Sequence, residues 1–185
     1  MTMPLLTRLH SLEACADAVA FVETCATVEE AWETCQDGHW LAWLVGRAHS
    51  SGGLTQQRLV RVILRVIEPV LYLAHGAADH LGVVARWTVG EATIEEVRTA
   101  HLALWRIRSD ADADAPYAAY ASAAAAYAAA AAAYASDAAA YAHSAVRAYS
   151  AAAYAAERAM ADVVRAAITI DELCAALDVT RGAVR

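Results

Sequence analysis

Charged side chains are scarce in this chain of 185 residues, in which Asp, Glu, Lys and Arg make up only 19% of the sequence. Hydrophobic residues, with alanine included, make up 59%, so the composition excludes intrinsic disorder. A chain of this length favours one domain and is long enough to bury a core. The net charge of −7 argues against a general nucleic-acid binder and suits a cytosolic protein, or a partner protein with a basic surface.

Signals for secretion, membrane insertion and disulfide bonding are also missing. Charged residues interrupt the first twenty positions, so no signal-peptide core is present. The longest apolar run, residues 59–85, carries too many charges for a membrane span. No Cys-x-x-Cys pair occurs, and we expect reduced, buried thiols in a cytoplasmic protein. The four cysteines are Cys15, Cys25, Cys35 and Cys174.

Strand-like alternation is almost absent, whereas apolar residues recur at helical spacing along most of the chain. One helix is predicted over residues 5–22. Three further helix starts are predicted by capping boxes, in which a threonine is followed three residues later by a glutamate. These threonines are Thr27, Thr93 and Thr169. Trp40 and Trp43 lie one helical turn apart and are expected to share a buried face, with Trp32 nearby.

After Gln56 and Gln57, residues 58–68 are apolar except for one narrow stripe, which predicts a helix at the centre of a bundle that is kinked or ended by Pro69. The stripe consists of Arg58, Arg61, Arg65 and Glu68. Its three arginines are candidate partner-binding residues that could hold an anion. The alternative is a solvated face that Glu68 partly neutralises.

Glycine and proline are absent from residues 117–167, and 25 of the 40 residues 117–156 are alanine. As one helix this segment would be roughly 75 Å long, too long for a compact domain of this size. We therefore expect a break near Ser136. Before it, residues 109–115 are predicted to form an acidic linker between an N-terminal helical part, 1–108, and the alanine- and tyrosine-rich part, 116–185. The predicted fold is all-α: a single bundle of six to eight helices.

Four tyrosines of this segment are spaced by seven residues and form one seam along a helix. They are Tyr120, Tyr127, Tyr134 and Tyr141. One interpretation is structural: alanine lets helices approach closely, and the tyrosine rings supply the buried area that alanine lacks. The other interpretation is an exposed recognition face, because tyrosine is frequent in protein interfaces. The two interpretations are compatible, and the seam is a candidate partner-binding site.

Motifs for catalysis, metal binding and cofactor binding are not found. His75 and His80 do not share a helix face, and the sequence has neither a nucleophile elbow nor a phosphate loop. Cys35 and His39 form only a weak thiol–imidazole pair. The expectation is a protein without enzymatic activity, metal or cofactor.

The last residues, 169–185, are similar to the middle of a bacterial helix-turn-helix, with a capped helix, a turn and the start of a recognition helix. Thr180, Arg181 and Arg185 are the candidate DNA-binding residues of this alternative. The recognition helix would be too short to cross a major groove, and nearby carboxylates offset its arginines.

The chain also contains several longer motifs: EEAWETC at 29–35, GHWLAWL at 38–44, WTVGEAT at 87–93 followed by EEVR at 95–98, and ADVVR at 161–165. Together these motifs resemble the alanine-rich immunity protein domain of actinobacteria and of the phages that infect them. The resemblance spans roughly residues 9–177. It implies an all-α, non-enzymatic binding protein.

The expected function is therefore that of a protein-binding inhibitor in the bacterial cytoplasm, immunity-like or a phage counter-defence protein, which occludes a partner such as a basic toxin or nuclease. Two alternatives remain open. One is a DNA-associated regulator that uses residues 169–185. The other is a small-ligand sponge with an apolar pocket between alanine-lined helices.

Overall fold

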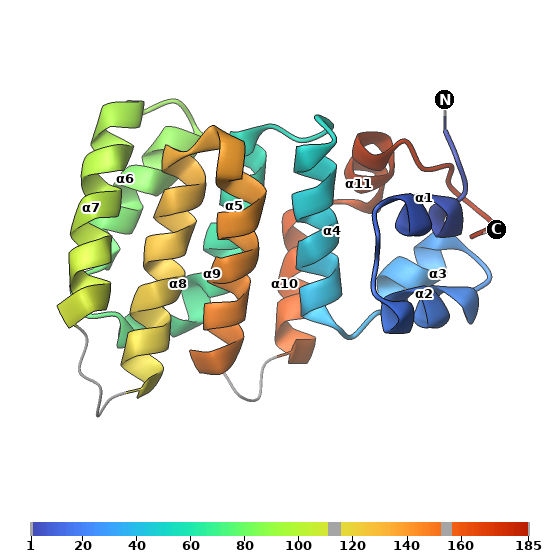
Figure 1. The fold of residues 1–185 in the computed structure, drawn as a ribbon, viewed down its shortest axis with the longest axis horizontal. Coiled ribbons are helices and arrows are strands. Elements are labelled where there is room, and N and C mark those ends of the chain that lie inside the picture. Colours follow the sequence, from blue (N-terminus) through green and yellow to red (C-terminus); the bar gives the residue numbers. More distant parts are fainter. Residues whose placement is uncertain (1, 111–115, 153–156, 185) are drawn as a thin grey trace.

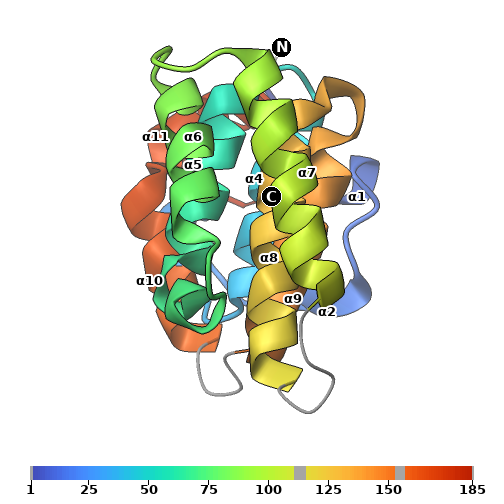
Figure 2. The same ribbon diagram turned by 90° about the vertical axis from the view of Figure 1, so that its left-hand side faces the viewer.

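Helices α4 to α10 lie in two layers (Figure 1). The computed structural model describes residues 2–110, 116–152 and 157–184. The front layer in Figure 1 holds, from left to right, α7 (Ile94–Asp110), α8 (Pro116–Ala133), α9 (Ala138–Ala152) and α4 (Gly38–Ser50). The back layer holds α6 (Ala78–Thr88), α5 (Gln56–Ile67) and α10 (Glu157–Ala167). Figure 2 shows the same two layers from the α7 end.

Three short helices lie beyond α4, at the end of the molecule opposite to α7 (Figure 1). They are α1 (Leu5–Ser11), α2 (Ala16–Glu23) and α3 (Val28–Thr34), which we call the N-terminal group. The last helix, α11 (Ile170–Leu177), packs against α4. Both ends of the described chain therefore lie on the same side of the molecule.

The all-α class is confirmed, but the helix count is not. The described residues form eleven α-helices and two short 3-10 helices, more than the predicted six to eight. One reason is that the single helix predicted over residues 5–22 is two helices. Glu13 adopts a left-handed φ of 58°, and the amides of Glu13 and Ala14 donate to His10 and Leu9 in a Schellman turn. Glycine usually marks such a turn, so a glutamate there gave no signal.

Helix α5 lies at the centre, as its narrow polar stripe predicts. All of its apolar residues except the partly buried Leu64 are completely buried: Leu59, Val60, Val62, Ile63, Val66 and Ile67. The helix ends at Ile67, and Pro69 lies in the first turn of the 3-10 helix η1 (Glu68–Leu73). The three predicted capping threonines also stand directly before α3, α7 and α11, and each side chain accepts a hydrogen bond from the amide three residues later.

The alanine segment breaks where expected. Helix α8 ends at Ala133, the 3-10 helix η2 (Ala135–Asp137) contains Ser136, and α9 begins at Ala138. A separate helix, α10, begins at Glu157, which was not predicted. Pro116 opens α8, whereas Ser109 and Asp110 belong to α7 and not to the predicted linker. The remaining linker positions, 111–115, lie outside the described residues.

Helix α8 is buried on almost every side. It packs against α7 and α9 in its own layer and against α5 behind it. Alanines 124–126 and 128–132 are all fully buried. Because a methyl group is the only side chain at these positions, neighbouring helices can approach closely.

Candidate functional site

The tyrosine seam is divided by the break after α8: Tyr120 and Tyr127 lie on α8, Tyr134 directly follows it, and Tyr141 lies on α9. Tyr120 is 45% exposed and Tyr134 is 40% exposed, while Tyr127 and Tyr141 are half-buried against the core. The expectation that every ring of the seam is buried against a neighbouring helix is therefore wrong for Tyr120 and Tyr134. The buried alanines occupy the rest of the helix circumference, so the rings cover only the outer edge.

Aromatic contacts join the seam to α7. The rings of Trp105 and Tyr127 are 6.0 Å apart, edge to face, and those of His101 and Tyr134 are 5.4 Å apart. The guanidinium of Arg108 lies 4.3 Å from the centre of the Trp105 ring and 4.9 Å from that of Tyr127. Such pairs each contribute on the order of 1 kcal/mol. These contacts hold the rings of Trp105, Tyr127 and Tyr134 in place.

Exposed apolar side chains continue from the seam onto α7. Leu102 is 59% exposed and Trp105 is 39% exposed. Three residues apart, they are neighbours on the helix surface. We call Leu102, Trp105, Tyr120, Tyr127 and Tyr134 the aromatic strip.

His101 is buried beneath the strip. Its Nδ1 has no hydrogen-bond partner among the described residues. Desolvation lowers its pKa, against a smaller opposing effect of a hydrogen bond to the backbone of Ala126. The imidazole is therefore neutral at pH 7 and packs as an aromatic ring.

The arginine stripe on α5 makes intramolecular contacts. Arg58 binds both carboxylate oxygens of Glu172, at 3.1 and 2.9 Å. This bond holds the pKa of Glu172 below its usual value. Arg61 donates to the carbonyl of Thr88 at 2.7 Å, and Arg65 pairs with Glu68 at 3.3 Å. Arg58 thus connects α5 to α11, Arg61 connects it to α6, and Arg65 pairs with Glu68 in the next turn. Because all three have intramolecular partners, the stripe does not favour an anion site.

The predicted start of a recognition helix does not form over the described residues 180–184. Asp178 ends α11 with a left-handed φ of 56°. The chain then runs extended along the N-terminal group, where Thr180 donates to Met3 at 3.0 Å and Val28 donates to Gly182 at 2.8 Å. Arg181 forms ion pairs with Glu29 and Asp171, and Arg185 lies outside the described residues.

An apolar cavity of about 60 Å³ lies where the N-terminal group meets α4 and α11. Its lining includes Phe21, Trp32, Trp40, Trp43, Ile170 and Leu173. The expected association of the three tryptophans is therefore confirmed, although Trp40 and Trp43 are only half-buried. The cavity is not between alanine-lined helices, and it is smaller than the roughly 300–1,000 Å³ of typical small-molecule sites.

Residues 13–37, which include α2 and α3, carry the net charge of the protein. They hold seven of the 21 carboxylates and none of the 14 arginines. The other 14 carboxylates balance the 14 arginines, so this segment accounts for the whole net charge of −7. Glu29, Glu30 and Asp37 bind Arg181 or backbone amides. The other four have no hydrogen-bond or ion-pair partner among the described residues, and all are exposed: Glu13, Asp17, Glu23 and Glu33.

Nucleophile and metal candidates find no support in the geometry. Burial raises the pKa of the Cys35 thiol, so the thiol is protonated at neutral pH and is a poor nucleophile. Cys25 and Cys174 are buried as predicted, but Cys15 is exposed. Within the described parts of the chain, no group of three or more His, Cys, Asp or Glu side chains is placed to hold a metal ion.

Two features were not predicted from the sequence: the acidic segment 13–37 and the aromatic strip. The acidic segment could have been found by counting charges segment by segment instead of over the whole chain. The aromatic strip had no such signal, because the pairing of α7 with the tyrosines of α8 is a tertiary contact.

Comparisons with protein-family models, curated proteins and solved structures give no match. None of the helices in the described residues is long and apolar enough to cross a membrane.

Proposed function

We propose that this protein is a non-catalytic inhibitor, immunity-like or acting against a defence protein, that occludes a partner protein with a basic surface. The observation that carries the proposal is the concentration of the entire net charge in residues 13–37. Opposite charge on the partner accelerates association and gives specificity.

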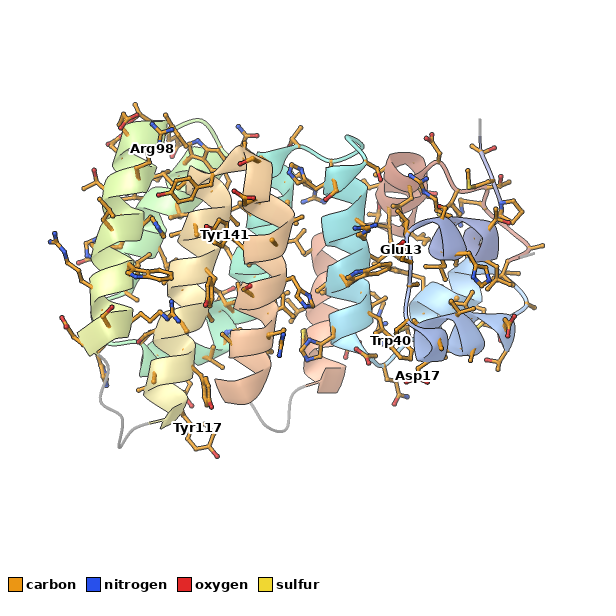
Figure 3. The ribbon with its side chains drawn as sticks, viewed as in Figure 1. Glu13, Asp17, Trp40, Arg98, Tyr117 and Tyr141 are labelled. Atoms are coloured by element: carbon orange, nitrogen blue, oxygen red, sulfur yellow. The ribbon has the colours of Figure 1, made fainter. Side chains whose placement is uncertain are left out.

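The acidic face has an apolar edge. In Figure 3, Glu13, Asp17 and Trp40 lie on the side of the molecule where the N-terminal group meets α4. Asp17 and Phe21 are one turn apart on α2, and the ring of Phe21 lies 6.0 Å from that of Trp40. Aromatic anchors beside charged groups are typical of the residues that dominate binding energy at interfaces.

The fold supports binding of this kind. The carboxylates of Glu13, Asp17, Glu23 and Glu33 are not needed for described internal contacts, so they are free to pair with arginine or lysine side chains of another protein. Two helices of the N-terminal group, α1 and α3, are fixed by backbone bonds, because Leu6 donates to Val184 and Val28 donates to Gly182. A partner therefore meets a preformed surface, which lowers the entropy cost of association.

Affinity capture from a lysate of the organism that encodes the chain tests the proposal. The bait is the wild type or a variant with Glu13→Gln, Asp17→Asn, Glu23→Gln and Glu33→Gln. We expect the wild type to retain a basic protein at low salt and to release it as the ionic strength rises. The variant should not retain it.

The matched control neutralises four exposed carboxylates elsewhere: Asp79, Glu91, Asp110 and Asp137. It has the same net charge as the first variant and should capture the partner like the wild type. Equal loss with both variants would mean that the total charge matters and not the N-terminal group.

The contact can also be mapped by carbodiimide coupling. The sequence contains no lysine, so apart from its amino terminus the chain offers only carboxylates to this reaction. Amide cross-links to the partner's lysines should fall within residues 13–37. Cross-links confined to α6–α9 would contradict the proposed surface.

A further inference from the structure

The cavity where the N-terminal group meets α4 and α11 is partly open to solvent and almost wholly apolar. Some of its lining side chains are nearly fully buried, such as Leu5, Leu9 and Leu173, whereas Phe21 and Trp40 reach the surface. The lining therefore runs from the core to the surface, and an apolar group can enter it from outside.

The volume of the cavity limits what fits. An apolar cavity of about 150 Å³ holds a benzene molecule, which corresponds to about 25 Å³ for each carbon atom. At about 60 Å³, this cavity holds about two or three carbon atoms. That is the size of a valine side chain, whereas a phenyl ring is too large. Affinity is limited by the number of atoms that a ligand contributes, so the group that enters belongs to a larger molecule.

Carboxylates stand beside the part of the cavity that reaches the surface. Asp17 is one turn before Phe21 on α2, and the ring of Phe21 contacts Trp40. Figure 3 shows Asp17 and Trp40 on the same side of the molecule. Asp37 stands directly before α4 and accepts hydrogen bonds from the amides of His39 and Trp40. Basic residues that flank the entering side chain would therefore meet negative charge.

Arg47 gives this charge a direction along α4. Its guanidinium lies 5.7 Å from the centre of the Trp43 ring and donates to the carbonyl of Leu12 at 3.1 Å. Because Trp43 also lines the cavity, the lining has a positive charge at one end and the carboxylates of Asp17 and Asp37 at the other. The basic residues of a partner should therefore lie nearer to the start of α4 than to its end.

We propose that this cavity is the socket for one small aliphatic side chain, such as valine, carried by a basic segment of the partner protein. The inference rests on the proposed function and adds the kind of segment that the acidic surface selects. The carboxylates attract the segment, and burial of the aliphatic carbons supplies affinity that charge alone does not.

Short basic peptides test the socket with a defined partner. The probes are the acetylated and amidated peptides Arg-Arg-X-Arg-Arg, in which X is valine, glycine or phenylalanine. NMR titrations at low ionic strength, followed at the backbone amides and at the indoles of Trp40 and Trp43, give the dissociation constants. The valine peptide should bind about tenfold more tightly than the glycine peptide, because it buries three more carbons. It should also bind more tightly than the phenylalanine peptide, whose ring exceeds the cavity.

Filling the cavity from within supplies the matched variants. Ala18 lines the cavity and is buried, whereas Ala20 on the same helix is exposed and outside the lining. Ala18→Val should reduce the preference for valine over glycine to less than about twofold and leave binding of the glycine peptide unchanged. Ala20→Val should keep the wild-type preference. If circular dichroism shows that Ala18→Val is not folded, Ala31→Val replaces it at a second lining position.

The outcomes separate the socket from the acidic surface. Neutralising Glu13, Asp17, Glu23 and Glu33 should weaken binding of the valine and glycine peptides by the same factor. If the two peptides bind the wild type equally and neutralisation weakens both, the socket is overturned and the acidic surface stands. If Ala18→Val removes a valine preference but neutralisation has no effect, the socket is confirmed and the acidic surface is contradicted.

Three further results overturn the socket. The first is a valine preference that the folded Ala18→Val variant retains. The second is a phenylalanine peptide that binds as tightly as the valine peptide, because this would indicate general apolar attraction. The third is a valine peptide that does not bind the wild type at all, whatever the lysate capture shows for the acidic surface.

Discussion

Helix α8 packs against its neighbours through alanine, the smallest side chain that can form a contact, whereas the N-terminal group packs against α4 through large aromatic side chains. In α8, alanines 124–126 and 128–132 are fully buried. In the N-terminal group, Phe21 and Trp32 meet Trp40 and Trp43 of α4, and a cavity of about 60 Å³ remains between them. The small side chains fill the interface around α8, whereas the large side chains at the N-terminal group leave a cavity in theirs.

This difference determines which substitutions each region tolerates. An alanine contact depends on backbone proximity, and no side chain there can rotate to make room. Around the cavity, the large side chains have space to change rotamer, while the backbone bonds of Leu6 and Val28 to Val184 and Gly182 keep the N-terminal group in place. The two regions therefore share a fixed backbone and differ in the space around their side chains.

The largest expected effect is loss of an aromatic side chain at the cavity. Trp32 is only 8% exposed, so Trp32→Ala should lower the free energy of unfolding by about 3–5 kcal/mol. Urea unfolding monitored by circular dichroism measures this. A loss below about 1 kcal/mol would show that the N-terminal group already packs so loosely that Trp32 contributes little.

The next effect separates the two regions directly. Ala129 is fully buried and lies half a turn from the tyrosine stripe of α8, so Ala129→Leu should cost about 1–3 kcal/mol through overpacking. Ala18 lines the cavity, and Ala18→Val adds methyl groups where space exists.

For Ala18→Val we expect unchanged or higher stability. The two variants should be compared in the same urea series. If Ala18→Val destabilises as much as Ala129→Leu, the cavity is not accessible to the added methyl groups, and the contrast between the regions is wrong.

Local signals explain which parts of the fold were predictable. The threonine–glutamate spacing placed three helix starts, and the narrow stripe of α5 identified the central helix, because both patterns are fixed by residues a few positions apart. The break near Ser136 was predicted because a single helix over residues 117–167 would be too long for a compact domain of this size. The turn at Glu13 and the pairing of residues 179–184 with the N-terminal group depend on backbone conformation and distant contacts, so the sequence indicated one helix and a recognition helix instead.

The candidate sites divide in the same way. The seven-residue spacing placed Tyr120 and Tyr127 on one stripe of α8, but Tyr134 follows that helix and Tyr141 lies on α9, so the four tyrosines do not share one helix. Their exposure depends on how far α7 and α9 cover α8. The arginines of α5 were recognised as a stripe, yet their partners Glu172 and Thr88 are 114 and 27 residues away. Spacing along one helix cannot reveal which distant group a side chain contacts.

A smaller effect is expected at the edge of α8. Tyr127 is half-buried between Trp105 and Arg108, so Tyr127→Ala should cost about 1–2 kcal/mol, and Tyr127→Phe should be nearly neutral because the ring remains. Tyr120→Ala should stay within about 0.5 kcal/mol, as at an ordinary surface site. Urea unfolding gives the comparison. Equal losses at Tyr127 and Tyr120 would contradict the distinction between covered and exposed rings.

The smallest expected effect is a pH dependence that originates beneath the aromatic strip. Desolvation lowers the pKa of His101 from its usual value of 6.5. As the pH falls through about 6.5, the histidine of the unfolded chain binds a proton before that of the folded chain does, so the free energy of unfolding must decrease. His101→Phe keeps a ring against Tyr134 and removes the titrating group. Urea unfolding between about pH 7.5 and about pH 5.5 should therefore show a shallower decline for this variant than for the wild type. His143 on α9, whose pKa is also lowered mainly by desolvation, accounts for part of the remaining slope. Identical slopes for His101→Phe and the wild type would mean that His101 becomes protonated without loss of structure, and that α8 is less tightly enclosed at its outer edge than its buried alanines indicate.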